Sequence, residues 1–354
     1  MDFSLLVKPV GSACNLACDY CFYSLANGAQ VPAPARMPSA VLERMLATYL
    51  AEPLASPAVA FQGGEPLLAG EDFFREAAAI AARAHRRVSF SVQTNGTLIT
   101  PSLARFFAEE GWLVGVSVDG PAALHDIHRH TPSSSPSHGD VLAGLSALRS
   151  AGVEFNTLTL VTPTNATSPE MVYRHLRDEI GARFLQFIEC TSPAPYAVSG
   201  SAWGEFLCRL YDVWRACGDE RRVSVRLFDT IVLRLLGGPP DACPFASDCR
   251  NYFVVENDGS VYPCDFHVSP EWRLGDVMHD SWSSLVESPL YAAFGQRKSD
   301  LPSQCLECPY CFICQGDCVR NRAPGGPSRL CAGWRRFFDH AIPGLAELAR
   351  DVAR

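Results

Sequence analysis

The sequence predicts an α/β protein in which six strand–helix units are followed by a smaller cysteine-rich segment. Short apolar runs alternate with helical patterns as far as residue 223, which is typical of a parallel sheet, either open or barrel-like. Three cysteines closely follow the first apolar run, and a dense second group lies between Cys243 and Cys331. The 354 residues are enough for one large domain and a smaller one.

Local patterns predict the individual elements. Each expected strand is a short run of β-branched or aromatic residues, and these runs cover residues 5–7, 58–61, 88–92, 113–118, 155–161 and 184–188. Helical patterns between them cover residues 39–52, 72–85, 101–110, 140–151 and 169–179. Ser39 and Asp140 are expected N-caps, while Pro101 and Pro169 fit first helical turns.

The unusual segments of the first part all follow expected strands. In parallel α/β folds, chemistry collects at the carboxyl ends of the strands. Six segments rich in polar residues or cysteine fall there, namely residues 14–21, 62–66, 93–97, 117–121, 162–165 and 186–190. We therefore expect one functional face.

The first cysteine group consists of Cys14, Cys18 and Cys21 in a C-x3-C-x2-C spacing. Three thiolates can bind three irons of a [4Fe–4S] cluster, which leaves the fourth iron without a protein ligand. Reactive metal sites keep such a position open. The alternatives are a zinc site or buried free thiols, although zinc knuckles favour paired C-x2-C halves and no second pair lies nearby.

The segment CNLACDYCFY resembles the radical SAM superfamily, and Gly63-Gly64-Glu65-Pro66 resembles the GGEP motif of that family. The resemblance implies a partial (β/α)6 barrel whose open iron binds S-adenosylmethionine (SAM), which one electron then cleaves to a 5′-deoxyadenosyl radical. Two glycines would allow close backbone approach, and Glu65 would bind the methionyl amine. The implied SAM contacts are Tyr20, Gln62, Gly63, Gly64, Glu65, Asn95, Ser117, Asp119 and Leu185. Turn formation is the alternative for Asn95 and Asp119, and core packing for Leu185.

The second cysteine group surrounds a strong hairpin pattern, in which two strand-like runs flank an Asp258-Gly259 turn. Eight of its cysteines match two [4Fe–4S] clusters with four thiolates each, with a pair of zinc sites as the alternative. The arrangement resembles the SPASM domain. That resemblance implies an inner cluster on Cys243, Cys249, Cys264 and Cys318 and an outer cluster on Cys305, Cys308, Cys314 and Cys331, leaving Cys311 as a spare thiol.

The runs YFVVENDGSVYPCDF, FLQFIEC and LCAGWRRFFDH narrow the resemblance to the anaerobic sulfatase-maturating enzymes, over nearly the whole chain. The implied reaction converts a cysteine or serine in a C/S-x-P-x-R peptide of a sulfatase to Cα-formylglycine. The adenosyl radical would take a Cβ hydrogen, and the SPASM clusters would accept an electron. Asp265 matches the candidate base and Tyr23 matches a position near the target side chain, with hairpin capping and rim packing as the alternatives.

Composition limits the partners. A net charge of −8 without a basic run argues against nucleic acid, and no apolar stretch reaches membrane-spanning length. The N-terminus lacks the features of a signal peptide, so the fifteen cysteines are expected to be thiols or metal ligands in a reducing cytoplasm. The expected partners are a sulfatase or other peptide and an electron donor such as flavodoxin or ferredoxin.

The expected domains are a radical SAM barrel over residues 1–223, a SPASM domain over 224–340 and a C-terminal helix over 341–354. Residues 125–138 contain three closely spaced histidines but read as a mobile, solvated loop rather than a metal site, because the segment is rich in Ser and Pro. Cys190 has no assigned role.

Two other functions stay open. A radical SAM/SPASM maturase of ribosomally made peptides, forming crosslinks or thioethers or epimerising residues, is the first. Such enzymes often carry a leader-binding domain, which we do not expect here because the first strand begins close to Met1. A non-catalytic metal-binding or electron-transfer protein is the second.

Overall fold

The computed structural model describes residues 2–23, 36–191 and 195–353, and the chain divides into two compact units. The first unit comprises residues 1–116, 129–155 and 249–295, and the second comprises residues 117–128, 156–248 and 296–354. The domain boundaries expected after residues 223 and 340 stay predictions. Met1 and Arg354, which the expected ranges include, lie outside the described residues.

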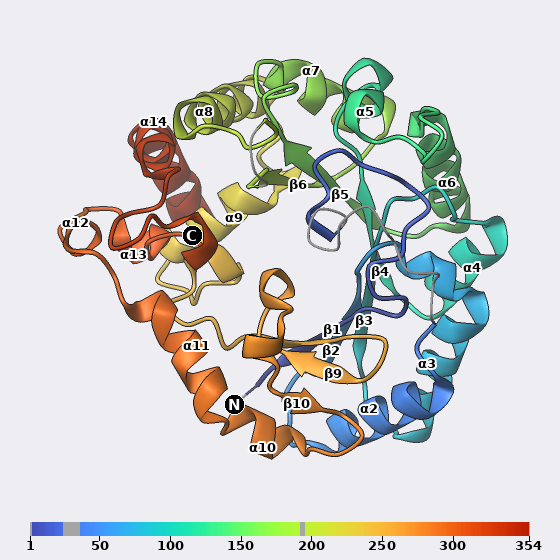
Figure 1. Ribbon diagram of the computed structural model, residues 1–354. Helices are drawn as coiled ribbons and strands as arrows, with labels where there is room; N and C mark the ends of the chain where they lie inside the picture. Colours follow the sequence, from blue (N-terminus) through green and yellow to red (C-terminus); the bar gives the residue numbers. More distant parts are fainter. Residues whose placement is uncertain (1, 24–35, 192–194, 354) are drawn as a thin grey trace. The chain divides into compact units, whose positions relative to one another are not determined.

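The first unit is built on a mixed sheet (Figure 1). Strands β1 (Ser4–Val7), β2 (Ala58–Phe61), β3 (Ser89–Thr94) and β4 (Leu113–Ser117) run parallel, and β8 (Tyr252–Val255) pairs with the other edge of β1, also in parallel. Strands β9 (Ser260–Tyr262) and β10 (Gly275–Asp276) continue the sheet in antiparallel fashion. Val7 is level with both Phe61 and Val255, so the carboxyl ends of β1, β2 and β8 meet at one edge.

Helices α2 (Ser39–Ala51), α3 (Glu71–Arg83) and α4 (Pro101–Glu109) lie outside these strands (Figure 1). The unit also contains α6 (His138–Ala151) and α10 (Trp282–Val286). Large aromatic side chains fill the space between sheet and helices. Phe61 and Trp112 stack with their ring centroids 5.5 Å apart, and Phe74 meets both rings edge-on. Each such buried side chain contributes about 2–3 kcal/mol of stabilisation, which fixes β2 and the loop that follows it.

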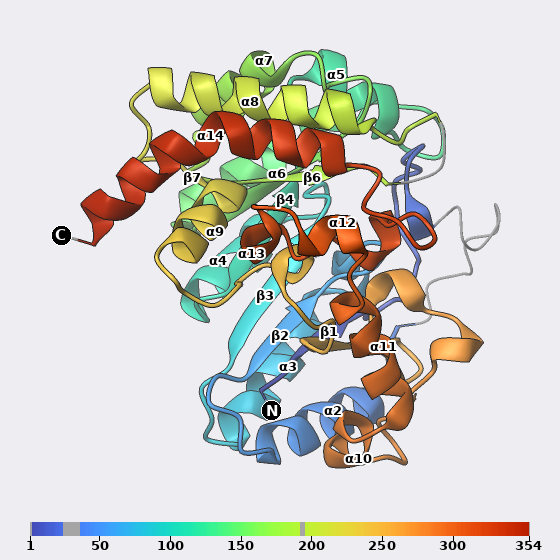
Figure 2. The same ribbon diagram turned by 90° about the vertical axis from the view of Figure 1, so that its left-hand side faces the viewer.

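The second unit contains the parallel strands β5 (Phe155–Val161), β6 (Phe184–Glu189) and β7 (Ser224–Val225). Its helices are α5 (Ala122–His128), α7 (Pro169–Arg174), α8 (Gly200–Ala216), α9 (Arg226–Leu235), α12 (Ser303–Leu306), α13 (Cys311–Cys314) and α14 (Cys331–Val352). Figure 2 shows α8 and α14 side by side. Their backbones approach so closely that a Cβ atom on Gly333 would lie 2.0 Å from the Gly200 carbonyl oxygen, and glycine avoids this clash.

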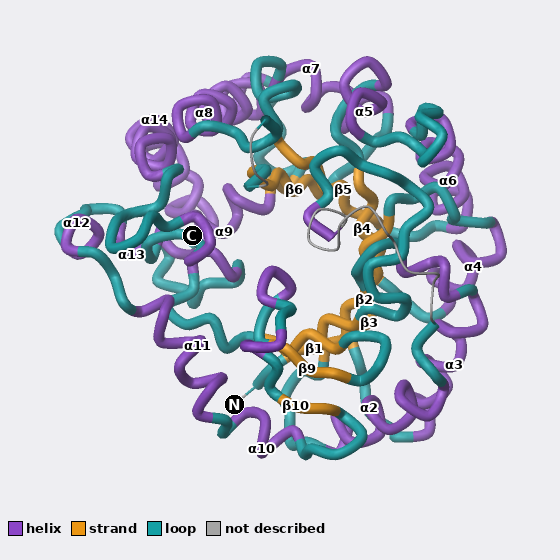
Figure 3. The backbone as a smooth tube through the Cα atoms, in the orientation of Figure 1, coloured by secondary structure: helices purple, strands orange, loops and turns teal. Residues whose placement is uncertain are grey.

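The segment between α11 (Pro289–Ser299) and α14 carries most of the second cysteine group and consists of loops and short helices (Figure 3). Such irregular backbone can present several thiols from a short length of chain. No described helix has both the length and the apolar character required to cross a membrane.

Most expected elements are confirmed. Strands 58–61 and 155–161 match to the residue, the hairpin forms, and Pro101 and Pro169 each begin a helix. The expected N-caps are wrong: α2 begins at Ser39 itself and is preceded by Pro38 at the cap position, and α6 begins two residues before Asp140 with Ser137 at the cap position. The helix expected from residue 341 begins at Cys331 and continues through Pro343.

The expected solvated loop at residues 125–138 is also wrong over part of its length. His125 and His128 belong to α5, and His138 is the first residue of α6. His125 is fully buried, with its Nδ1 accepting a hydrogen bond from the Asp119 backbone N–H at 3.3 Å. The Ser- and Pro-rich composition therefore describes only the middle of this segment.

Candidate active site

The GGEP loop (residues 63–66) of the first unit is packed against the loop that carries Cys14, Cys18 and Cys21, which we call the cysteine loop. The Gly64 N–H donates to the Gly11 carbonyl at 2.9 Å, and the Glu65 N–H donates to the Ala13 carbonyl at 2.8 Å. A Cβ atom on Gly64 would lie 2.0 Å from the Ala13 oxygen, so only glycine fits. Gly64 thus allows the two loops to touch. From the sequence, we expected this glycine to allow the approach of a ligand instead.

The Glu65 carboxylate is fully buried and accepts three hydrogen bonds. Oε1 accepts from the Leu67 N–H at 3.0 Å and from Thr94 Oγ1 at 2.7 Å, and Oε2 accepts from the Asn95 N–H at 2.7 Å. Burial raises the pKa of Glu65 to about 7, against the effect of these hydrogen bonds. A carboxylate has about four acceptor sites, so one on Oε2 is left for a further donor.

Asn95 joins the end of β3 to the cysteine loop. Its Nδ2 donates to Asn15 Oδ1 at 2.8 Å and lies 3.8 Å from Cys14 Sγ, while its Oδ1 accepts from the Thr97 N–H at 3.0 Å. Burial raises the pKa of the Cys14 thiol to about 11. A thiol in this environment ionises readily only when a cation compensates its charge, as cluster irons do. The donor set therefore fits an iron–sulfur cluster.

Residues 129–130 hold the other side of the cysteine loop. The Arg129 guanidinium lies 5.5 Å from the centre of the buried Tyr20 ring. His130 Nε2 lies 3.1 Å from Asp19 Oδ1, and the His130 carbonyl accepts from the Ala17 N–H at 2.8 Å. Tyr20 is thus fixed from a segment more than 100 residues later in the chain.

A buried charged group surrounds the candidate base, and we name Lys8, Tyr23, Glu256 and Asp265 the Lys8 network. Lys8 Nζ lies 2.7 Å from Asp265 Oδ1 and 2.8 Å from Glu256 Oε1. The Tyr23 hydroxyl donates to Asp265 Oδ2. Lys8 and Asp265 expose only 3% and 7% of their surfaces. Burial lowers the pKa of Lys8, but the two carboxylates outweigh it and the pKa is raised, so the ammonium stays charged.

The GGEP loop also contacts the Lys8 network. A Cβ atom on Gly63 would lie 3.2 Å from Lys8 Cβ and 2.7 Å from the Gly11 oxygen, so the lysine stem occupies the space that a side chain would need. The Gln62 side chain hydrogen-bonds to Tyr23. Burial raises the pKa of Tyr23 well above its usual value. Sequence reasoning found Tyr23 and Asp265 but missed Lys8 and Glu256. Their signal was position, because each directly follows one of the paired strands β1 and β8.

Three candidate SAM contacts lie in the second unit. Ser117 is largely buried, and Asp119 Oδ1 accepts from the Leu160 N–H at 2.9 Å, which ties Asp119 to β5. Leu185 is 1% exposed within β6, between Thr157 of β5 and Val225 of β7. The burial of Leu185 agrees with the core role that the sequence left open for it.

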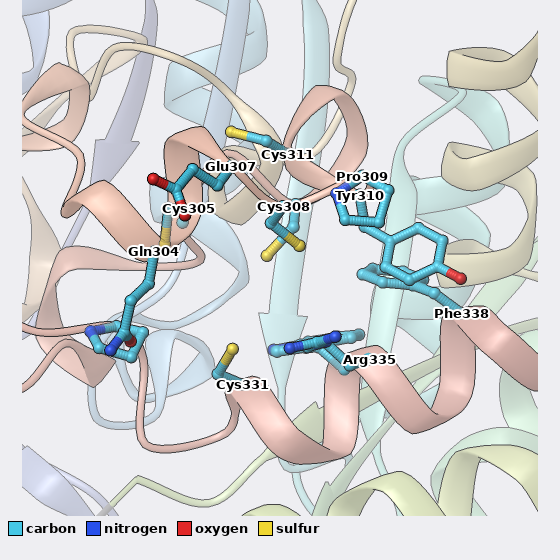
Figure 4. A pocket seen from close by; sticks show the side chains of 14 residues that line it. Gln304, Cys305, Glu307, Cys308, Pro309, Tyr310, Cys311, Cys331, Arg335 and Phe338 are labelled. Atoms are coloured by element: carbon cyan, nitrogen blue, oxygen red, sulfur yellow. The ribbon is translucent and has the colours of Figure 1, made fainter.

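The second unit contains a cavity of about 460 Å³ among the later cysteines, and its cysteine lining consists of Cys305, Cys308, Cys311, Cys314 and Cys331. Figure 4 shows the Cys308 and Cys331 thiols directed into the same space, whereas the Cys311 thiol points away from them. Within the described ranges no three His, Cys, Asp or Glu side chains converge closely enough to hold one metal ion. Several thiols that line one cavity fit a multi-iron cluster.

The remaining cysteines of the second group lie in different units. Cys243 begins a short 3-10 turn (Cys243–Phe245) and Cys318 precedes another (Val319–Asn321), both in the second unit. Cys249 and Cys264 belong to the first unit, where the Tyr252 hydroxyl lies 3.4 Å from Cys264 Sγ. The assignment of these four thiols to one cluster stays a prediction.

Comparisons with known proteins agree with these features. Residues 9–176 match the Radical SAM superfamily model, and residues 243–309 match an iron–sulfur cluster-binding domain. The cysteine-type anaerobic sulfatase-maturating enzyme of Clostridium perfringens (strain 13 / Type A) is 35% identical, with 99% of both chains covered. The chain belongs to this family of radical SAM enzymes.

The matching relatives include enzymes named as cysteine-type and enzymes named as serine-type. A serine-type anaerobic sulfatase-maturating enzyme of Bacteroides thetaiotaomicron is 33% identical over 98% of this chain and 91% of that protein. A solved structure described as native anSMEcpe with bound AdoMet has a TM-score of 0.93, with 34% identity, and covers 99% of this chain and 100% of that one. A structure of Streptococcus suis SuiB with its precursor peptide is 14% identical at a TM-score of 0.64 and covers 93% of this chain and 75% of that one, which shows a shared fold only.

Proposed function

We propose that this enzyme oxidises a cysteine or serine side chain of a sulfatase peptide to Cα-formylglycine. The observation that carries the proposal is the Lys8 network of this family member. In it the buried Asp265 carboxylate is paired with Lys8, and its second oxygen accepts a hydrogen bond from the Tyr23 hydroxyl. Similar proteins named as cysteine-type and serine-type maturating enzymes support the reaction class.

The cofactors of this proposal are SAM and three [4Fe–4S] clusters. Cys14, Cys18 and Cys21 would hold the first cluster, and the second cysteine group would hold two auxiliary ones, in the arrangement given above. When bound, SAM and its cluster supply an adenosyl radical that removes a Cβ hydrogen, and the auxiliary clusters accept one electron. Electrons for SAM cleavage would come from a donor such as flavodoxin or ferredoxin.

The residues of the chain supply binding and proton transfer. Glu65 would offer its remaining acceptor site to the methionyl amine of SAM, and Asn95, Ser117 and Asp119 would contribute polar contacts. Asp265 would accept the thiol or hydroxyl proton of the target, and its Oδ1 is paired with the Lys8 ammonium. Tyr23 would orient the carboxylate by donating to Oδ2.

The test is mass spectrometry after anaerobic turnover of the reconstituted enzyme with SAM, a reductant and a Cys-x-Pro-x-Arg peptide, with a serine peptide alongside. The expected product is an aldehyde at the target residue, with one 5′-deoxyadenosine per event. Asp265→Asn should prevent aldehyde formation but leave SAM cleavage intact. Asp258→Asn, the same change at an exposed turn of the same hairpin, is the matched control and should react normally. SAM cleavage with neither peptide altered would reject the substrate assignment and point to a different peptide.

A further inference from the structure

Lysine is rare in this protein and is kept only at buried positions. Two of the 30 basic residues are lysines, and the other 28 are arginines. Lys8 and Lys298 are 3% and 1% exposed, although lysine is among the residues least often buried. Lys8 belongs to the network around Asp265. The second buried ammonium, Lys298, lies among the later cysteines.

Lys298 joins two cysteine-bearing loops of the second unit. It lies in the last turn of α11, and its Nζ donates to the Pro244 carbonyl at 2.8 Å and to the Asp317 carbonyl. Pro244 directly follows Cys243, and Asp317 directly precedes Cys318. The two carbonyls that the buried ammonium binds therefore belong to residues adjacent in sequence to Cys243 and Cys318, two cysteines that the family pattern places on the same cluster.

The loop before Cys318 is shaped to present its carbonyls to cations. Gln315, Gly316 and Asp317 all have positive φ angles of 48°, 71° and 59°. Left-handed backbone costs roughly 1–2 kcal/mol for each residue other than glycine. Arg322 holds this turn by donating to the Gln315 and Gly316 carbonyls, at 3.0 and 2.9 Å, and it also binds the Lys298 carbonyl at 2.9 Å. The position of the ammonium is thus fixed from both sides.

A fixed buried cation has a defined effect on an anionic cluster. A cubane with four thiolate ligands carries a net negative charge that increases on reduction, and net charge and hydrogen bonding set its potential. Charges interact strongly where water is excluded, so a nearby ammonium favours the reduced form. Lysine suits this position because it is a compact point charge with three donors, whereas the planar fork of arginine is made for bidentate partners.

We propose that Lys298 is a positioning residue that raises the reduction potential of the auxiliary cluster held in part by Cys243 and Cys318. The cluster would accept one electron as the substrate carbon radical loses one, so the ammonium favours the oxidation step. This inference rests on the proposed function for the source of the electron. The potential itself is a property of the loaded protein.

The test is potentiometric titration of the full-length chain, followed by electron paramagnetic resonance, in a Cys14→Ala, Cys18→Ala, Cys21→Ala background that loads only auxiliary clusters. Lys298→Gln keeps an amide that can donate to both carbonyls but removes the charge. We expect it to weaken reduction of at least one auxiliary cluster tenfold or more, which is about 59 mV for one electron. Lys298→Arg, which keeps the charge, should stay much closer to the parent protein.

Arg234 provides the matched control. Its guanidinium donates to the Phe312 carbonyl at 2.6 Å and the Gly238 carbonyl at 2.7 Å, but it is only partly buried. Arg234→Gln should change the reduction equilibrium less than twofold. A less than twofold change in Lys298→Gln would overturn the proposal, and so would loss of auxiliary iron in that variant, because the residue would then be required for assembly. No peptide is present, so failure of this proposal is distinct from failure of the proposed function.

Discussion

Lys8→Met tests the assignment of Asp265 as a charged base. The ammonium lies 2.7 Å from Asp265 and 2.8 Å from Glu256, and each attraction is about 6 kcal/mol at an effective dielectric of 20. Desolvation offsets much of this, and removal of one partner from a buried pair typically costs about 3–5 kcal/mol. Without Lys8 two carboxylates would share a buried site, which favours protonation of one of them.

A protonated Asp265 cannot accept the substrate proton. General bases contribute about 10²–10⁴-fold to rate, so Lys8→Met should slow aldehyde formation roughly 100-fold. SAM cleavage should continue, which would raise the ratio of 5′-deoxyadenosine to aldehyde. The assay measures both products from one reaction by mass spectrometry and chromatography.

Two further variants make this test sharper. Arg83→Met removes an exposed ion pair with Glu43, whose side chains are 61% and 63% exposed, and should change neither product. Adding Glu256→Gln to Lys8→Met removes the like charge beside Asp265 and should restore part of the aldehyde yield. Aldehyde formation by Lys8→Met within threefold of the native rate would refute the reasoning.

Three other predictions concern individual side chains. Burial and a nearby aspartate raise the pKa of Glu189 to about 7, so the folded state keeps a proton that the unfolded chain releases, and stability falls as pH rises from about 4.5 through 7. Glu189→Gln should therefore stabilise the protein by about 3 kcal/mol at pH 8 and much less at pH 5, measured as melting midpoints; an equal effect at both pH values would contradict this. Lys8 and Lys298 should resist an amine-acylating reagent until the protein unfolds, and peptide mapping that finds either one modified in the folded protein would contradict their burial. Cys311→Ala should retain the full iron content, whereas Cys308→Ala should lose iron, because the Cys308 thiol is directed into the same space as the Cys331 thiol and the Cys311 thiol points away from both; equal iron loss would place Cys311 among the ligands.

The sequence predicted strands better than helix ends. A buried strand is a continuous apolar run between polar loops, so residues 58–61 were found to the residue. Helix starts depend on which of several neighbouring residues leaves helical backbone, and Ser39 had Pro38 directly before it. His125 was misjudged because composition reports local chemistry, whereas its burial in α5 comes from tertiary packing.

Motifs with several fixed positions were the most readable part of the candidate site. The three-cysteine loop and the GGEP loop constrain one another in space, since the Glu65 N–H is bonded to the Ala13 carbonyl. The glycines could be identified, but not the partner that they approach, because a sequence motif does not specify which backbone lies against it. Asp265 was found from its place after Cys264, while its charge partners lie more than 200 residues earlier, at Lys8, and nine residues earlier, at Glu256.

The two lysines show why buried charged residues were the hardest part of the candidate site to predict from the sequence. A charged residue is normally exposed, so residue type alone did not mark Lys8 or Lys298 as internal. The signal for the two lysines in the sequence is their contrast with 28 arginines. A chain that uses arginine almost everywhere keeps lysine where a compact ammonium is needed. Lys8 holds two carboxylates, and Lys298 holds two carbonyls beside cysteines. If this reasoning holds, Lys8→Arg should be destabilising even though it conserves charge, because the Lys8 stem already fills the space beside Gly63. A Lys8→Arg protein with native melting temperature and native aldehyde yield would show that charge alone, and not the shape of the side chain, is what that site requires.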